Sequence, residues 1–275
     1  MLLVCREEME KRGWKELDFV LVTGDAYIDH PSFGIAVIAR VLEAEGFRVG
    51  VLSQPSWKGP EDFTVFGRPG IAFLVTSGNL DSMVNKYTSF KKPRRTDVYS
   101  PGGKPGMRPD RALIPYTSRI RQAYKGIPVI LGGLEASLRR LSHYDYWSDS
   151  IRRSVLLDAK ADLLVYGMGE APIIEVARRL SKGERIEEIR NIRGTVYAVP
   201  REEAEEDWDT EETLVLPEYE EVKQGAEAFV ESTRLRYEQI FPRTAKRIVE
   251  PYDRRWVVQN PPPFPLSRKE LDRIY

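Results

Sequence analysis

The sequence predicts a doubly wound α/β domain of the Rossmann-like or flavodoxin-like type, with a mostly parallel sheet. Short, continuous apolar segments rich in Val, Ile and Leu alternate with segments of helical apolar spacing through the first 200 residues. Glycine and small polar residues follow several of the apolar segments. Continuous apolar strands that alternate with helices are typical of a parallel sheet covered on both faces.

The predicted elements follow one another in a regular order. Strands are expected over residues 19–23, 47–52, 70–76, 127–131, 161–166 and 194–199. The first helix, over 35–45, stops at Gly46, which suits the position after a helix C-terminus. A second helix is expected over 111–124, with its regular part beginning at Pro115, and an amphipathic one over 171–180.

The last part of the chain departs from this alternation. Residues 201–221 hold eleven acids and one base, which is typical of a solvated connector. Residues 219–247 have the spacing of one or two surface helices, and the proline-rich run 260–265 predicts a stiff extended linker. The start of a helix follows this run, so we expect the chain to be truncated. We therefore expect an α/β domain over 1–200 and a helical, Pro-rich extension over 201–275.

Composition excludes several classes of protein. Lys+Arg and Asp+Glu are equal at 42 each, and a net charge of zero argues against a general nucleic-acid binder. The single cysteine, Cys5, excludes an internal disulfide, and two histidines are too few for a Cys/His zinc site. No apolar run approaches the length of a membrane span or a signal peptide. We expect a cytoplasmic protein with no membrane partner.

The candidate site lies at the carboxyl ends of the predicted strands, where open parallel sheets bind ligands. Glycine there lets the backbone approach a ligand, and the helix N-termini that follow favour anions. Each loop alone is also explained by the needs of a turn, but all of them together favour a ligand site. The candidates are Thr23, Gly24, Asp25, Asp29, His30, Ser32, Gly34, Ser77, Gly78, Asn79, Gly132, Gly133, Glu135, His143, Asp145, Gly167, Gly169 and Glu170.

Two groups of these candidates have competing interpretations. His30 either ligates a metal or cobalt, or relays a proton with Asp25 or Asp29. Alternatively, the Asp-His-Pro turn only launches a helix, with Asp29 or Ser32 as its cap. The aromatic segment 143–147 (HYDYW) either lines a pocket for a planar ligand or covers the sheet end, with its polar tips bonded to one another.

A long basic loop over residues 83–108 is the third unusual feature. It holds seven bases against one acid, Asp97, with several prolines and glycines. Its cations suit phosphate-bearing ligands, although solvated charge is the commoner reason for such a loop. A nucleophile elbow, a P-loop and a dinucleotide fingerprint are all missing from the sequence.

Several long sequence strings carry a specific resemblance. TGDAYIDHPSFG, SGNLDSMVNKYTS, RPDRA, GGLEASLRRLSHYDYW, DLLVYGMGE and QNPPPFPL occur in this order, and on them the chain resembles YgiQ-type radical SAM proteins from about Glu8 to Tyr275. The resemblance implies a cobalamin-binding-like N-terminal domain followed by a radical SAM partial barrel. That barrel would hold a [4Fe-4S] cluster on a C-x-x-x-C-x-x-C motif and cleave S-adenosylmethionine to a 5′-deoxyadenosyl radical.

This chain lacks the cluster motif, so we expect no catalytic or metal-binding residue in it and no activity from it alone. Its expected partner is its own C-terminal barrel. Cobalamin is possible but poorly supported: of the patterns D-x-H-x-x-G, S-x-L and G-G, only Gly132-Gly133 matches.

The sequence therefore predicts a cofactor-binding, substrate-binding or regulatory domain of a radical SAM enzyme whose substrate is unknown. The alternative is a stand-alone α/β module for a phosphorylated small molecule or single-stranded nucleic acid. A hydrolase built on Asp25, Asp29 and His30 is a third and weaker hypothesis.

Overall fold

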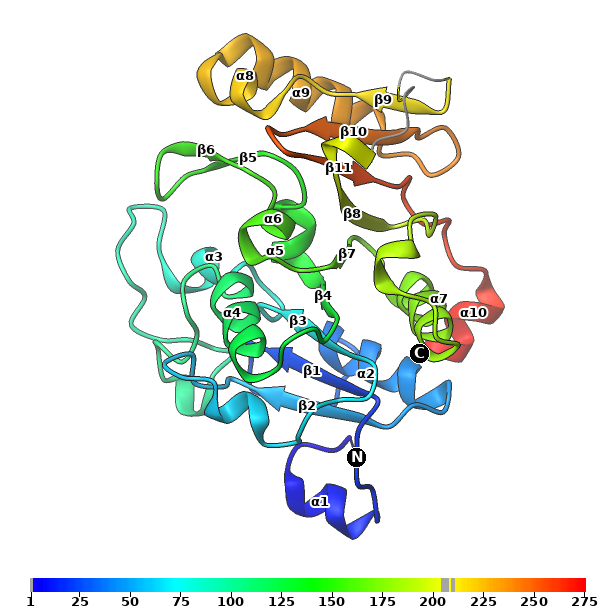
Figure 1. Ribbon diagram of the computed structural model, residues 1–275. Helices are drawn as coiled ribbons and strands as arrows, with labels where there is room; N and C mark the ends of the chain where they lie inside the picture. Colours follow the sequence, from blue (N-terminus) through cyan, green and yellow to red (C-terminus); the bar gives the residue numbers. More distant parts are fainter. Residues whose placement is uncertain (1, 204–207, 209–210) are drawn as a thin grey trace.

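One large sheet crosses the molecule, with helices packed on both of its faces (Figure 1). The computed structural model describes residues 2–203, 208 and 211–275. The strands of this sheet are β1 (Phe19–Thr23), β2 (Val49–Ser53), β3 (Ala72–Thr76), β4 (Val129–Leu131), β7 (Leu163–Val165), β8 (Thr195–Pro200), β9 (Thr213–Val215), β10 (Arg247–Pro251) and β11 (Arg255–Gln259). The α-helices are α1 (Arg6–Lys11), α2 (Gly34–Ala44), α3 (Ser82–Lys86), α4 (Leu113–Ala123), α5 (Gly133–Leu138), α6 (Val155–Ala159), α7 (Glu170–Ser181), α8 (Tyr219–Gln224), α9 (Ala226–Glu238) and α10 (Arg268–Ile274).

The strand order is β2-β1-β3-β4-β7-β8-β11-β10-β9. The first five of these strands are mutually parallel, and in chain order they follow the flavodoxin-like 2-1-3-4-5 pattern. β8 then runs antiparallel to β7 and to β11, which gives the sheet its mixed far end. The predicted doubly wound, mostly parallel fold is confirmed.

Alternating strand residues feed two apolar cores, one on each face of the sheet. Val20, Phe73 and Leu131 point to the face covered by α4, α5 and α6. Leu21 and Leu74 point to the opposite face, where α2 and α7 pack. Because both faces are buried, the parallel strands are apolar at nearly every position, which is why their pattern was readable from the sequence.

The strands and helices predicted within the first 200 residues are confirmed to within a few residues, whereas the helices expected over 219–247 end at Glu238, and residue 247 begins β10. The helix expected over 111–124 begins at Leu113, so Pro115 lies in its first turn, where a missing N–H costs nothing. Sequence patterns missed the small antiparallel hairpin of β5 (His143–Asp145) and β6 (Ser150–Arg152), which is inserted between α5 and α6. They also missed β10 and β11, whose charged residues and Pro251 are uncommon in strands.

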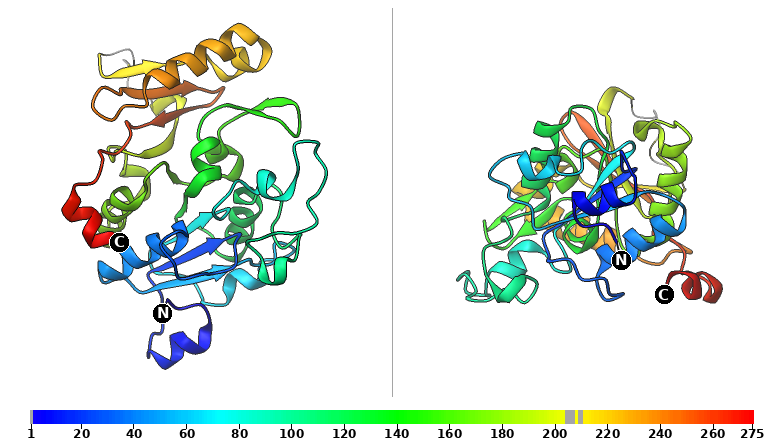
Figure 2. Two further views of the ribbon diagram at one scale, coloured as in Figure 1. Left: turned by 180° about the vertical axis from the view of Figure 1, so that it is seen from behind. Right: turned by 90° about the horizontal axis from the view of Figure 1, so that it is seen from below.

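The C-terminal quarter of the chain joins the same sheet. Part of the segment expected to be a solvated connector, residues 201–221, instead forms β9. Thr213 in this strand and Leu216 just after it are buried, while residues 204–207 and 209–210 lie outside the described part. The run 260–265 has no regular structure, as expected, but Asn260 is buried. It is followed by α10, which lies beside α7 in the view from behind in Figure 2 and also contacts α2.

The predicted boundary at residue 200 therefore falls between two strands of one sheet, and the division into 1–200 and 201–275 stays a prediction. β8 pairs with β11 from Val196–Gln259 to Pro200–Arg255. We expect a fragment of residues 1–200 to lose cooperative thermal unfolding or aggregate, because its β8 edge is left unpaired. Circular dichroism would measure this against a control ending at residue 265, which lacks only α10. An unchanged midpoint in the 1–200 fragment would contradict the expectation.

Candidate functional site

A cavity of about 450 Å³ opens at the carboxyl ends of β1, β3, β4 and β7. It includes the crevice between β1 and β3, where the strand order reverses and where flavodoxin-like sheets bind ligands. Its walls are largely apolar and come from the strands and from α2 and α7. The apolar lining residues include Leu21, Ile35, Ile38, Leu74, Ile130, Val165 and Ile173.

Half of the predicted site residues line this cavity. They are Ser32, Gly34, Gly78, Asn79, Gly132, Gly133, Gly167, Gly169 and Glu170. The loops after the four strands therefore do meet at one place, as parallel strands require. Thr76 and Leu134, from the same strand-end segments, also line it, and so does Tyr99, which sequence reasoning missed. Tyr99 comes from the basic loop, and no local pattern indicates that this loop folds back over the strand ends.

Glu170 is the charged group of the cavity wall. It is the first residue of α7 and is only 7% exposed. One carboxylate oxygen, Oε1, accepts a hydrogen bond from the Tyr275 hydroxyl at 3.2 Å. The other, Oε2, is buried and has no hydrogen-bond partner among the described residues. A buried carboxylate oxygen without a partner is costly, so a hydrogen-bond donor in the cavity would offset that cost.

Asp25 lies beneath the cavity in a buried ion pair. Its Oδ1 accepts a hydrogen bond from Arg108 Nη2 at 2.6 Å, and its Oδ2 accepts one from the Asn79 backbone N–H at 2.6 Å. Asp97 Oδ2 lies 3.6 Å from the same guanidinium nitrogen. Burial raises the pKa of Asp25, and the Arg108 guanidinium opposes the rise. Asp25 thus ties the basic loop to the loops after β1 and β3.

Thr23, Gly24 and Ser77 serve this packing and do not line the cavity. A side chain at Gly24 would meet the Ser77 carbonyl oxygen at 2.3 Å from its Cβ. The Thr23 hydroxyl accepts the Asp25 backbone N–H at 3.2 Å, and the Ser77 hydroxyl donates to the Leu80 carbonyl at 2.8 Å. The two hydroxyls thus bond within their own loops, and Gly24 lets the loops approach each other closely, which explains the small size and polarity of these residues without a ligand.

Glu135 lies in a second buried polar cluster, next to the cavity wall. Its carboxylate accepts the backbone N–H of Ser82 at 2.8 Å and that of Leu113 at 3.4 Å. Burial raises the pKa of Glu135, and the neighbouring Asp81 raises it further. Arg139 is paired with Asp81 at 2.8 Å. Glu135 therefore anchors the starts of α3 and α4 and faces backbone donors.

Asp29 and His30 lie on the surface, outside the cavity lining. Asp29 pairs with Arg40 of α2, and the His30 Nδ1 lies 2.7 Å from the Ser32 hydroxyl. Asp25, Asp29 and His30 each engage a different partner, so nothing supports the hydrolase hypothesis. The position of His30 also gives no support to its role as a metal or cobalt ligand, and the turn does lead into α2. The prediction that Asp29 or Ser32 caps this helix is wrong, because its N-cap is Phe33, which makes no side-chain cap hydrogen bond.

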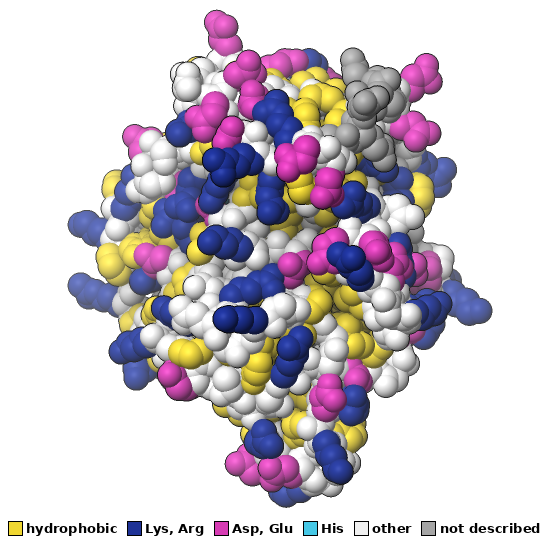
Figure 3. Space-filling model, in the orientation of Figure 1, with side chains coloured by type: hydrophobic (Ala, Val, Ile, Leu, Met, Phe, Trp, Pro, Cys, Tyr) yellow, Lys and Arg dark blue, Asp and Glu magenta, His cyan; other side chains and the backbone are white. Residues whose placement is uncertain are grey.

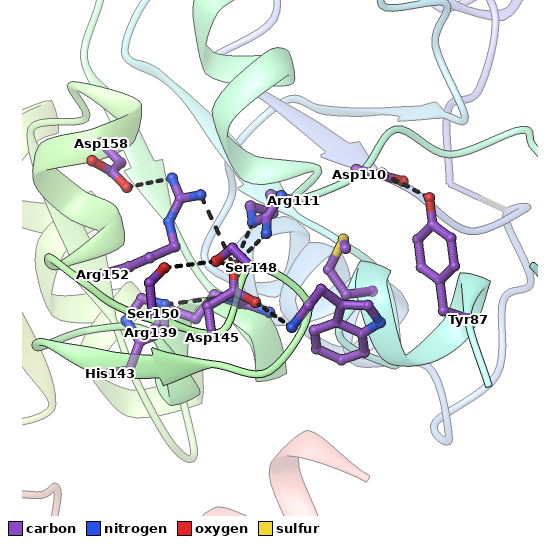
Figure 4. A network of polar contacts seen from close by, with 12 residues as sticks. Tyr87, Asp110, Arg111, Arg139, His143, Asp145, Ser148, Ser150, Arg152 and Asp158 are labelled. Carbon is purple, nitrogen blue, oxygen red and sulfur yellow. Dashed lines mark hydrogen bonds and ion pairs between the residues drawn. The ribbon is translucent and has the colours of Figure 1, made fainter. Parts of the chain in front are cut away.

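His143 and Asp145 form a separate network on the β5–β6 hairpin (Figure 4). Asp145 is buried and pairs with Arg111, and it accepts a hydrogen bond from the Ser148 hydroxyl at 2.9 Å. The His143 Nε2 lies 3.3 Å from Arg139, and its Nδ1 lies 3.1 Å from the Leu141 carbonyl. Burial lowers the pKa of His143 to about 4. The aromatic segment thus stands away from the cavity, with its charged groups bonded within the protein.

The described residues contain no group of three or more His, Cys, Asp or Glu side chains that could hold a metal ion. Cys5 is the single cysteine of the chain, so the thiolates needed for an iron–sulfur cluster are not present in it. None of the helices in the described part is both long and apolar enough to cross a membrane.

Fold and cavity together define a flavodoxin-like domain with a ligand-sized cavity at its topological switch point. The family model described as "Radical SAM N-terminal" matches residues 1–275. The chain therefore belongs to the Radical SAM N-terminal family, which confirms the resemblance found in its sequence strings.

The curated relatives are longer proteins. A UPF0313 protein of Clostridium botulinum (strain Okra / Type B1) is 50% identical over 275 residues, covering 100% of this chain and 42% of the relative. A UPF0313 protein of Thermotoga maritima is 52% identical over 274 residues, covering 100% and 47%. The chain thus spans less than half the length of these relatives. No solved structure matches the chain.

The buried ion pair leads to a stability prediction. Arg108→Met should lower the free energy of unfolding by about 3–5 kcal/mol, because it leaves Asp25 charged and unpaired in the interior. Urea unfolding would measure the loss. Arg95→Met, on the exposed part of the same loop, should change it by less than about 0.5 kcal/mol. The double variant Asp25→Asn/Arg108→Met should recover part of the loss, because it removes both charges. Equal losses in Arg108→Met and Arg95→Met would contradict the role of the pair.

The lowered pKa of His143 leads to a pH prediction. Histidine in the unfolded chain has a pKa of about 6.5, so between that pH and about 4 the unfolded state binds a proton at His143 and the folded state does not. The free energy of unfolding should therefore fall as the pH drops from about 6.5 toward 4, by about 2 kcal/mol between pH 7 and pH 5.

The comparison that isolates this effect is between the unchanged chain and His143→Gln, because other groups also titrate in that range. Urea unfolding at pH 7 and pH 5 should show a shallower loss in the variant. Parallel losses in the two proteins would show that His143 is not the group responsible.

Proposed function

We propose that this chain is the ligand-binding domain of a radical SAM enzyme and that it holds a small cofactor or substrate in the cavity at the strand ends. The observation that carries the proposal is Glu170 Oε2, a buried acceptor without a partner among the described residues, in the wall of a largely apolar cavity. Ligand cavities are typically apolar with a few polar groups that orient the ligand.

The edges of the cavity add donors to this acceptor. α2 and α7 both begin at its wall, and neither has a side-chain cap on its first backbone N–H groups. Such N–H groups need acceptors, which water or a ligand can supply. The cavity therefore suits a ligand with an apolar body, a donor for Glu170 and an acceptor for a helix N-terminus.

The radical chemistry belongs, in this proposal, to the longer protein. Membership of the family and the length of the relatives support a further domain that holds a [4Fe-4S] cluster and S-adenosylmethionine. When bound, that cluster would supply the electron that cleaves S-adenosylmethionine to a 5′-deoxyadenosyl radical. The contribution of this chain is to bind and orient a ligand next to that domain. A reducing cytoplasm is the location that we propose for such an enzyme.

Cobalamin stays a prediction for the identity of the ligand. The cavity lies where a cobalamin-binding-like fold would place a cofactor, but His30 pairs with Ser32 on the surface. If cobalamin binds, we expect it to do so without His30 as a ligand to cobalt. The substitution His30→Ala should then leave its affinity unchanged.

Ligand binding, with and without a substitution that blocks the cavity, tests the proposal. Hydroxocobalamin, S-adenosylmethionine and a small-molecule fraction of host cells would each be added to the 275-residue chain while its thermal unfolding is followed. A ligand at 100 times its Kd stabilises a protein by about 2.7 kcal/mol. Ile38→Trp, at the cavity wall, should abolish the rise in midpoint, whereas Val230→Trp, on the exposed face of α9, should keep it. No rise with any probe, or equal rises in both variants, would contradict a ligand site here.

The enzyme class needs a separate measurement on a longer form of the protein. After anaerobic reconstitution with iron and sulfide, it should show iron–sulfur absorbance and release 5′-deoxyadenosine from S-adenosylmethionine. Failure of both would contradict the class, independently of what the cavity binds.

A further inference from the structure

A second surface of the molecule combines positive charge with exposed aromatic rings. It is formed by the basic loop between α3 and α4 and by the tip of the β5–β6 hairpin, and we name it the basic ledge. Figure 3 shows Lys and Arg side chains along the left of the view, the side where Figure 1 draws this loop. The residues of the basic ledge are Phe90, Lys91, Lys92, Arg94, Arg95, Lys104, Tyr144 and Tyr146.

The cations of the basic ledge are not neutralised by the protein. Most arginines of this chain pair with a carboxylate, but Lys92, Arg94, Arg95 and Lys104 form no ion pair with any described residue, and all four are exposed. The one acid of the loop, Asp97, is buried against Arg108 and cannot offset them. The neutral total of the chain thus conceals a local positive surface.

The basic ledge has a defined shape. Tyr87 and Pro93 form an isolated antiparallel bridge, and the Asp97 carboxylate accepts the Tyr99 N–H at 2.9 Å. The hairpin is attached to the loop, because the Tyr146 hydroxyl donates to the Ser89 carbonyl at 2.6 Å. The Lys91 ammonium lies 4.8 Å from the centroid of the Tyr146 ring. Loop and hairpin therefore present one continuous surface.

Aromatic rings stand among these cations. Phe90 is 85% exposed, an extreme value for a ring with no polar atom. Tyr144 is 48% and Tyr146 44% exposed, although both hydroxyls are bonded within the protein, to Asp149 and Ser89. What these tyrosines offer to a partner is therefore mainly their rings.

We propose that the basic ledge binds single-stranded nucleic acid, with the cations on the phosphates and the rings stacked on unpaired bases. Backbone-tracking positive charge and base-stacking aromatics are the two parts that such binding requires. An acidic protein would need the charge but not the rings. An anionic membrane is usually bound by an amphipathic helix, whereas residues 87–100 here contain no helix. The inference stands apart from the cavity and from the radical chemistry.

Fluorescence anisotropy with a labelled single-stranded RNA, and with DNA of the same sequence, tests the proposal on the 275-residue chain. We expect binding that weakens as salt rises, because each neutralised phosphate releases counterions. Lys91→Glu/Lys92→Glu/Lys104→Glu should weaken it at least tenfold and flatten its salt dependence. Phe90→Ala should weaken it about fivefold or more while leaving the salt dependence unchanged, since it removes stacking and no charge.

The matched control is Lys15→Glu/Lys125→Glu/Lys182→Glu. It makes the same change of charge at three exposed lysines, two of which precede β1 and β4 and so lie toward the other end of those strands. Its affinity should stay within about twofold, and thermal unfolding would verify that every variant is folded. Equal losses in both triple variants, or no binding at low salt, would overturn the proposal. Binding to phosphatidylserine–phosphatidylcholine vesicles in place of the oligonucleotides would overturn it in favour of a membrane.

Discussion

The buried pair of Arg108 and Asp25 is the interaction on which the arrangement of the loops at the carboxyl ends of the strands depends. It joins residues 83 positions apart and so fixes the long basic loop to the loop after β1. The Nε and Nη1 atoms of Arg108 are buried and have no hydrogen-bond partner among the described residues, so only part of the cost of burying this charge pair is offset. Asn79 satisfies the second carboxylate oxygen of Asp25 from the loop after β3. Three separate segments thus meet at one carboxylate.

The glycines of the strand-end loops follow from this pair. At Gly78, where φ is +110°, a Cβ would lie 2.1 Å from Asp25 Oδ1. At Gly24 it would collide with the backbone of the β3 loop. These glycines are therefore needed to let two loops and an ion pair occupy the same space. The cavity next to them is lined by these loops and by residues of α2 and α7.

The mixed end of the sheet plays a different part. Its strands cover β8 and bring the buried Glu250 of β10 against Ser142, whose backbone N–H donates to it at 2.8 Å. Tyr252 also donates to Glu250, and Arg236 of α9 donates to the Ser142 carbonyl at 2.6 Å. The C-terminal strands and α9 thus support the start of the hairpin that carries part of the basic ledge. Tyr275, at the other end of this segment, reaches Glu170 in the cavity wall.

Sequence alone determined the α/β class, the parallel strands and the place where half of the candidate site residues meet, because these follow from local periodicity and from the rule that parallel strands end at one edge. It could not show that Asp25 forms an ion pair with Arg108, that Asp29 and His30 lie on the surface, or that Tyr99 lines the cavity. Nor could it place His143 and Asp145 on a separate hairpin. Those outcomes depend on contacts between residues far apart in the chain, and only tertiary packing decides which of several possible partners each charged side chain finds.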